Sequence, residues 1–193
     1  MSKSIYLVLD MMNDLVHPDG PNGKGPYGEQ SQARNIVANS RAAIDKARAA
    51  GVPVGFVRVG FSPDYRECPP SSPIFSGARD RQIFQLGGWG TETHPVLGQR
   101  AEDFDIVKHR VSPFYATTLE AILSAKGISR IYCSGISTNA VVQAAVRDGH
   151  DRDFEMVVLE DCCCGLSAEE HDIAIKSLQR FCTITTSADV VFE

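Results

Sequence analysis

The chain has 193 residues, of which 43% are hydrophobic and 22% charged, so it is long and apolar enough to bury the core of one globular domain. Its net charge is −5 without a basic stripe, which argues against nucleic acid or an anionic membrane surface as the main partner. No apolar stretch nears the roughly 18 residues that a membrane helix needs, and the N-terminus lacks the apolar segment of a signal peptide. We expect one cytoplasmic domain over residues 1–193 that acts on a small molecule.

Runs typical of strands alternate with helical runs, which is the pattern of βαβ units and a parallel sheet. We predict strands at 4–10, 53–59, 104–108, 129–134, 154–160 and 182–186. A first helix is predicted from the apolar residues that recur between Ala33 and Ala47 and stop before Gly51. Three more are predicted at 117–126, 138–148 and 167–180, the last opening with a capping box. The predicted fold class is a doubly wound α/β fold with helices on both faces of the sheet.

Two segments do not fit this alternation: Val16–Gly28, which is rich in glycine and proline, and Phe61–Arg100, about forty residues long. Unstructured loops of that length are uncommon inside compact domains and usually serve as functional lids or interface arms. Either segment is therefore a candidate cover for a site. The second holds seven large apolar residues, which predicts a homo-oligomer, a dimer or tetramer: Phe61, Tyr65, Ile74, Phe75, Ile83, Phe84 and Trp89.

Charged residues end two of the predicted strands. Asp10 closes the first apolar run and Lys108 closes the third. Because ligands of an open α/β sheet bind beyond the carboxyl ends of its strands, both residues are expected at one rim. There they would form a partly desolvated ion pair, in which the lysine holds the aspartate ionised until the reaction needs a proton. This pair predicts an enzyme.

The segment Gly135-Ile136-Ser137-Thr138-Asn139 is predicted to turn from a strand into a helix at the same rim. Free backbone N–H groups and the positive end of the helix would bind a substrate oxyanion or carboxylate there. An ordinary strand-to-helix turn explains the segment equally well. Glycine-rich dinucleotide and Walker motifs are absent, so we expect no nucleotide and no other cofactor.

Motifs along nearly the whole chain, taken together, resemble one family. They are Leu7-Val-Leu-Asp10 with Met12 and Asn13, Ile106-Val-Lys108 followed by Ser112-Pro-Phe114 and Thr117-Thr-Leu119, Gly135-Ile-Ser-Thr-Asn139, Ala145-Val-Arg-Asp148, and Val158-Leu-Glu-Asp161 with His171. In order and spacing they resemble the isochorismatase-like hydrolases, which include nicotinamidases, N-carbamoylsarcosine and other ureido amidohydrolases, and isochorismatase itself. The resemblance implies a six-stranded parallel sheet, Asp10 and Lys108 as two members of a catalytic triad, and a cis peptide at Ile136–Ser137.

The chain departs from this family at the nucleophile. The amidohydrolases carry a reactive cysteine in the first turn of the helix after Gly135, where a helix N-terminus and a nearby cation lower the pKa of a thiol. The matching residue here is Val141, whose alkyl side chain cannot attack a carbonyl. Isochorismatase itself and some relatives also lack this cysteine. The metal-binding members use an Asp-x-His and a second histidine after the second strand, which this chain lacks, so we expect no catalytic metal.

Several further residues are candidates for the site or for the core. Cys162, Cys163 and Cys164 follow the fifth strand, and one of them is a candidate relocated nucleophile, although buried free thiols are the simpler interpretation. Phe114 and Trp89 are candidate walls for a flat substrate, as are Tyr27 and Tyr115, and each is equally a candidate for core packing or a subunit interface.

Three functions remain open from the sequence. The leading hypothesis is a hydrolase in which Asp10 acts as general acid-base and Lys108 fixes charge and substrate, without a covalent thiol intermediate. The second is an amidohydrolase or ureidase with a displaced thiol or an activated water. The third is a catalytically silent member that binds a ligand.

Overall fold

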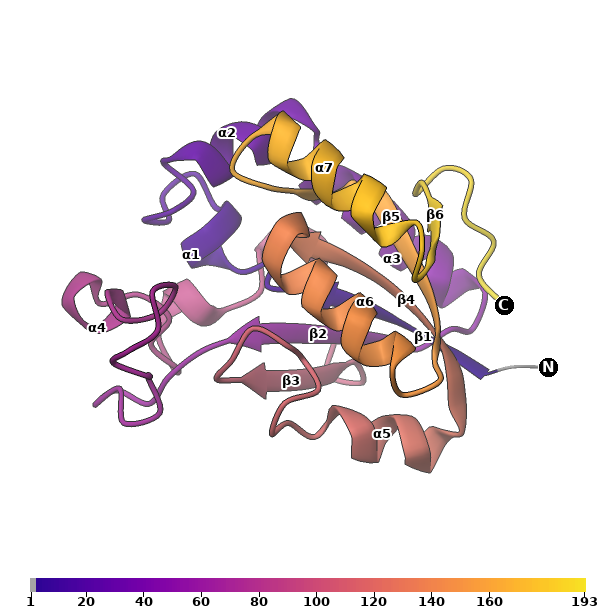
Figure 1. Cartoon of the computed structure of the whole chain (residues 1–193), viewed down its shortest axis with the longest axis horizontal. Helices are drawn as coiled ribbons and strands as arrows, with labels where there is room; N and C mark the ends of the chain where they lie inside the picture. Colours follow the sequence, from indigo (N-terminus) through magenta and orange to yellow (C-terminus); the bar gives the residue numbers. More distant parts are fainter. Residues whose placement is uncertain (1–2) are drawn as a thin grey trace.

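Six parallel strands form one sheet in the computed structural model, which describes residues 3–193 (Figure 1). The strands are β1 (Lys3–Leu9), β2 (Val54–Val59), β3 (Phe104–Lys108), β4 (Ile128–Ile136), β5 (Glu155–Cys164) and β6 (Thr183–Thr185). Their order is β3-β2-β1-β4-β5-β6, so the chain winds outward from β1 in both directions. The predicted doubly wound, parallel α/β fold is confirmed.

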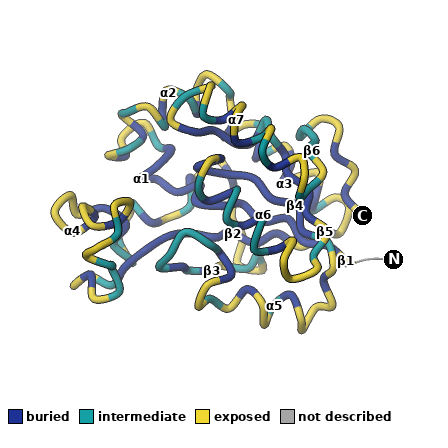
Figure 2. The backbone as a smooth tube through the Cα atoms, in the orientation of Figure 1, coloured by how far each residue is buried: buried dark blue, intermediate teal, exposed yellow. Residues whose placement is uncertain are grey.

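Helices lie on both faces of the sheet. They are α1 (Asn13–Val16), α2 (Pro26–Ala33), α3 (Ile36–Ala49), α4 (Ala78–Arg81), α5 (Leu119–Lys126), α6 (Gln143–His150) and α7 (Ala168–Leu178), with a π turn at Thr138–Val142 directly before α6. Alternate residues of β1 face opposite ways, so Tyr6 packs in the core on the α3 side and Leu7 in the core beneath α5 and α6. Figure 2 shows the buried strands between exposed helix surfaces. No helix within residues 3–193 is both long and apolar enough to cross a membrane.

The four predicted crossover helices are present, and their ends follow the predicted capping residues. Gly127 ends α5 with φ of +62°, and Ser167 opens α7 by accepting a hydrogen bond from the backbone N–H of Glu170. The predicted ends of β4 and β5 are too early, because these strands continue to Ile136 and Cys164. β5 thus passes through two acidic residues, Glu160 and Asp161, before it reaches the rim of the sheet.

The segment Val16–Gly28 is packed tightly against its own backbone. A Cβ on Gly23 would lie 1.9 Å from the carbonyl oxygen of His17, and one on Gly28 would lie 1.7 Å from that of Gly23. Only glycine allows such approaches. The glycines therefore hold this segment in a compact turn that leads into α2, a helix that the sequence did not predict.

The segment Phe61–Arg100 folds over the carboxyl ends of the strands, on the side of the molecule where α1 and α4 lie (Figure 1). The segment is not the exposed apolar arm that the sequence suggested, because five of its seven large apolar side chains are buried within the chain. The other two, Ile74 and Trp89, are 54% and 46% exposed. Homo-oligomerisation stays a prediction, without this support.

Candidate active site

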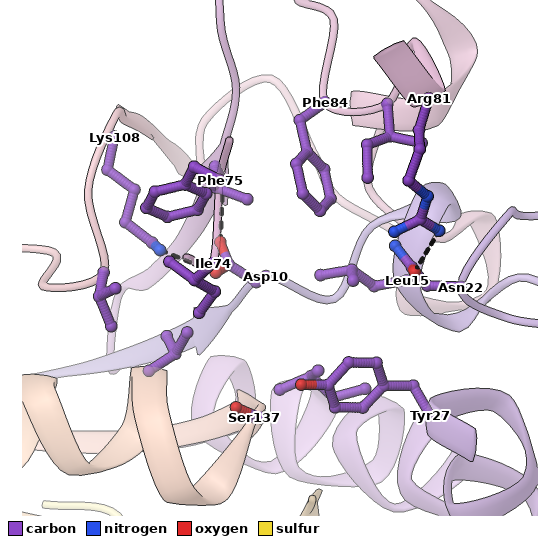
Figure 3. A pocket seen from close by; sticks show the side chains of 15 residues that line it. Asp10, Leu15, Asn22, Tyr27, Ile74, Phe75, Arg81, Phe84, Lys108 and Ser137 are labelled. Carbon is purple, nitrogen blue, oxygen red and sulfur yellow. Dashed lines mark hydrogen bonds and ion pairs between the residues drawn. The ribbon is translucent and has the colours of Figure 1, made fainter. Parts of the chain in front are cut away.

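Asp10 and Lys108 form a buried ion pair at the rim of the sheet (Figure 3). Asp10 directly follows β1 with φ of +54°, and Lys108 is the last residue of β3. The Lys108 Nζ lies 2.8 Å from Asp10 Oδ2, and the side chains are 1% and 2% exposed. Asp10 Oδ1 accepts a hydrogen bond of 2.8 Å from the backbone N–H of Val59, and Lys108 Nζ donates one of 3.1 Å to the carbonyl oxygen of Arg110. Both charged groups are thus held in one orientation.

Burial raises the pKa of Asp10 above its ordinary value. The charge and hydrogen bond of Lys108 and the N–H of Val59 act in the opposite direction, but their effect is smaller. The expectation that the lysine holds the aspartate ionised is therefore not supported by the direction of this shift. A carboxyl group with a raised pKa keeps its proton to higher pH and is suited to act as a general acid.

The end of β4 brings the backbone of Gly135 against β1. Gly135 has φ of +137°, and a Cβ there would lie 2.0 Å from the carbonyl oxygen of Leu9. The Ile136–Ser137 peptide is cis, as the family resemblance implied. Beyond it, Thr138 Oγ1 hydrogen-bonds to His171 Nδ1 at 2.8 Å, which ties the π turn to α7. The turn is thereby fixed on both sides.

A cavity of about 170 Å³ opens above the ion pair. It is smaller than the roughly 300–1,000 Å³ of pockets for drug-sized ligands, so it fits a small metabolite. Its lining is contributed by the rim of the sheet and by both long segments: Asp10, Leu15, Asn22, Tyr27, Val59, Ile74, Phe75, Arg81, Ile83, Phe84, Lys108, Val111, Ile136, Ser137 and Val141. The two segments singled out in the sequence thus cover the cavity.

The cavity contains five of the nine predicted site residues. Asp10, Lys108, Ile136, Ser137 and Val141 line it. Val141 is the residue that the family resemblance matches to the cysteine of the amidohydrolases. The other four predicted residues, two in the turn and two aromatic, are outside the lining: Gly135, Thr138, Phe114 and Trp89.

Of the aromatic residues that the sequence offered as walls or as core, Phe114 and Trp89 lie outside this cavity lining. Phe114 is buried in the core, with its ring stacked on that of Phe154 at 6.0 Å. Trp89 lies outside the cavity with its ring at 5.0 Å from that of His17. Tyr27, the third candidate wall, does line the cavity. The aromatic residues that replace them are Phe75 and Phe84.

Sequence reasoning also missed Arg81 and Asn22, which meet across the cavity mouth. Arg81 Nη2 donates a hydrogen bond of 2.8 Å to Asn22 Oδ1 (Figure 3). The two residues are 59 positions apart. The only signal for them in the sequence was their location in the two long segments.

The cysteines lie outside this lining. All six thiols are free, and Cys162, Cys163 and Cys164 are buried in β5. Burial raises the pKa of each of these three thiols, that of Cys164 to about 12. A buried thiol with a raised pKa is a poor nucleophile, so the structure gives no support to a displaced cysteine. Within residues 3–193, no three His, Cys, Asp or Glu side chains gather as metal ligands.

Comparisons with known proteins agree on one family. Residues 4–189 match the model of the isochorismatase domain. The chain is 32% identical to the uncharacterized isochorismatase family protein YecD of Escherichia coli O157:H7 over 89% of this chain and 85% of that protein. It is 33% identical to the ureidoacrylate amidohydrolase RutB of Yersinia enterocolitica over 83% of this chain and 74% of that protein. A cysteine hydrolase structure from Pseudomonas syringae pv. phaseolicola 1448A superposes with a TM-score of 0.87 at 23% identity, covering 97% of this chain and 90% of that one.

Proposed function

The chain belongs to the isochorismatase family of hydrolases, and we propose that it cleaves a small substrate by acid–base catalysis through Asp10 and Lys108, without a protein nucleophile. The observation that carries this proposal is the buried 2.8 Å ion pair facing a cavity that Val141, the residue matched to the family's nucleophile, also lines. Burial raises the pKa of Asp10, a direction that favours its role as proton donor.

The contacts of Asp10 suit both proton transfers of such a reaction, the donation to the substrate and the uptake from water. Protonated Asp10 donates its proton to the substrate, and the carboxylate that results is stabilised by Lys108 and by the N–H of Val59. Water then attacks the cationic intermediate, and the proton released by that water returns to Asp10. Asp10 is thus protonated again at the end of the reaction, and no covalent bond to the protein forms.

A vinyl ether, or another acid-labile bond, fits this sequence of steps. Proton transfer to the terminal vinyl carbon gives an oxocarbenium ion, and addition of water to that ion gives a hemiacetal. The hemiacetal then separates into an alcohol and a carbonyl compound. Because the alkyl side chain of Val141 has no lone pair, water is the nucleophile that adds to the oxocarbenium ion.

The second candidate is an amidohydrolase or ureidase that uses an activated water. It is favoured by the 33% identity to the ureidoacrylate amidohydrolase RutB. Amide cleavage asks Asp10 first to act as a base toward water, which requires its ionised form, and burial disfavours that form. This candidate therefore predicts a rate that rises with pH, whereas vinyl ether cleavage predicts a rate that falls with pH.

The test is turnover by the wild type and by Val141→Cys on matched vinyl ethers, amides and ureides, with intact mass measured on quenched samples. We expect the wild type to cleave an acid-labile member and to carry no adduct. Amide or ureide cleavage that rises with pH would favour the second candidate, and a covalent adduct on the wild type would contradict both candidates. If ligands bind at this rim but none is turned over, the protein is a silent binder.

A further inference from the structure

Arg81 is the one cationic side chain of the cavity lining without a carboxylate at ion-pair distance. It is the last residue of α4, and its hydrogen-bond partner is the neutral amide oxygen of Asn22. The ion pairs found among residues 3–193 do not include it. A guanidinium group has five N–H donors, so most of its donors are not used by Asn22.

The charge of Arg81 is not balanced by the other residues that line the cavity. Asp10 and Lys108 pair with each other at 2.8 Å. Arg81 also acts on the carboxyl group of Asp14, whose pKa it lowers although burial raises that pKa more strongly. Asp14 is outside the cavity lining, and its Oδ2 accepts a hydrogen bond from the N–H of Phe84. The cavity therefore offers one uncompensated positive group.

The rest of the cavity wall is mostly apolar, and the two polar ends are separated. Asp10 and Lys108 lie at one side of the cavity, and Arg81 and Asn22 lie at the other (Figure 3). Most of the other lining residues are aliphatic or aromatic: Leu15, Val59, Ile74, Phe75, Ile83, Phe84, Val111, Ile136 and Val141. A ligand that matches this wall has an apolar body, a reactive bond at one end and a charged group at the other.

We propose that Arg81, with Asn22 beside it, binds a carboxylate of the substrate and so restricts the enzyme to small organic acids. This proposal rests on the proposed function, because it places the reactive bond at Asp10. A guanidinium matches the two oxygens of a carboxylate and makes charge-assisted hydrogen bonds that are shorter and stronger than neutral ones. The amide of Asn22, now an acceptor, can turn its NH₂ toward the same anion.

The experiment measures dissociation constants by calorimetry for acids and their primary amides, which match in size and differ in charge. The probes are ethoxyacetate with ethoxyacetamide, and butyrate with butyramide, none of which carries the acid-labile vinyl ether bond. Asp10 is kept in the background, because Asp10→Asn would leave Lys108 as a second unpaired cation in the cavity. We expect each acid to bind about tenfold or more tightly than its amide, since a charge-assisted pair is roughly twice as strong as a neutral one.

In the same background, Arg81→Gln is expected to reduce this acid preference to about one, and Arg81→Lys to keep part of it. The matched control is Arg79→Gln, which removes the same charge from an arginine of α4 that hydrogen-bonds to the carbonyl oxygen of Asp64 outside the cavity. An acid preference that survives Arg81→Gln, equal binding of acid and amide, or no binding of the acids would overturn the proposal.

Turnover, measured for the wild type and for Asp10→Asn, separates this proposal from the proposed function. If Arg81→Gln abolishes the acid preference while Asp10→Asn keeps the wild-type rate, the carboxylate site stands and the acid–base mechanism fails. If Asp10→Asn abolishes turnover while the acid preference is unaffected by Arg81→Gln, the mechanism stands and the carboxylate site is refuted.

Discussion

At the scale of single residues, the candidate chemistry depends on one buried carboxyl group and its cation. Asp10 lies in a position where burial raises its pKa and Lys108 limits that rise. The pH dependence of the reaction should report both effects. If Asp10 is a general acid, the rate falls as pH rises through its raised pKa, because the protonated form is lost.

Lys108→Met keeps much of the side-chain volume but removes the charge that lowers the pKa of Asp10. The pKa of Asp10 should then rise further, and the falling limb of the pH–rate profile should move to higher pH. A carboxyl group whose pKa is raised on folding stabilises the fold below its unfolded pKa of about 3.9, and this contribution is lost as pH rises. The melting temperature of the variant should therefore fall with pH more steeply than that of the wild type. Unchanged pH profiles for rate and melting would show that the two groups are not coupled.

Thiol alkylation should leave the activity largely intact. The three cysteines of β5 are buried and lie outside the cavity lining, and their raised pKa values suppress the reactive thiolate. The measurement is intact mass and turnover after iodoacetamide, with a denatured sample as the control for labelling. Inactivation that substrate prevents, with the label on Cys162, Cys163 or Cys164, would restore the displaced-thiol mechanism.

The site residues on strand ends were predictable, and those on loops were not. Asp10 and Lys108 follow from the rule that parallel strands deliver their carboxyl ends to one rim. Phe84 and Arg81 reach the cavity because the long segment folds back over that rim, which no local periodicity encodes. The sequence left Phe114 open between core and cavity, because an aromatic residue near a rim satisfies the same sequence pattern in both, and the structure buries it in the core.

At the scale of elements, the position of the site depends on the close approach of β4 to β1. Gly135→Ala should destabilise the protein by roughly 1–3 kcal/mol or more, because its φ is +137° and a Cβ would lie 2.0 Å from the carbonyl oxygen of Leu9. Gly77→Ala is the control, since a Cβ there has open space and its φ is −83°. The measurement is denaturant unfolding of both variants. An equal free energy of unfolding for the two variants would show that β4 can move away from β1 without a loss of stability.

The strands and crossover helices were predictable because apolar periodicity and capping residues are local signals. The ends of the strands were less predictable. β5 runs through Glu160 and Asp161, two charged residues that usually mark the end of a buried strand. Here they are accommodated by tertiary partners, with Glu160 paired to Arg34 at 2.7 Å and Asp161 accepting hydrogen bonds from Ser187. Such partners are not visible in the sequence pattern.

At the scale of the whole molecule, the assembly of the chain stays a prediction. The long segment Phe61–Arg100 buries most of its apolar side chains in its own chain, yet several large apolar side chains remain exposed elsewhere, including Tyr115 and Ile173, each 62% exposed. We expect a dimer or tetramer at micromolar concentration. Light scattering after size exclusion gives the mass directly. A monomer mass would show that these side chains are ordinary surface residues.

The central claim is tested most directly by turnover in Asp10→Asn. The amide keeps the size of the side chain and much of its hydrogen bonding but cannot donate or take up the catalytic proton, so kcat should fall by roughly 10²–10⁴-fold. Binding of the same substrate should change much less, because the cavity and its other contacts are kept. A wild-type rate in Asp10→Asn, on the substrate that the wild type cleaves, would contradict the acid–base account.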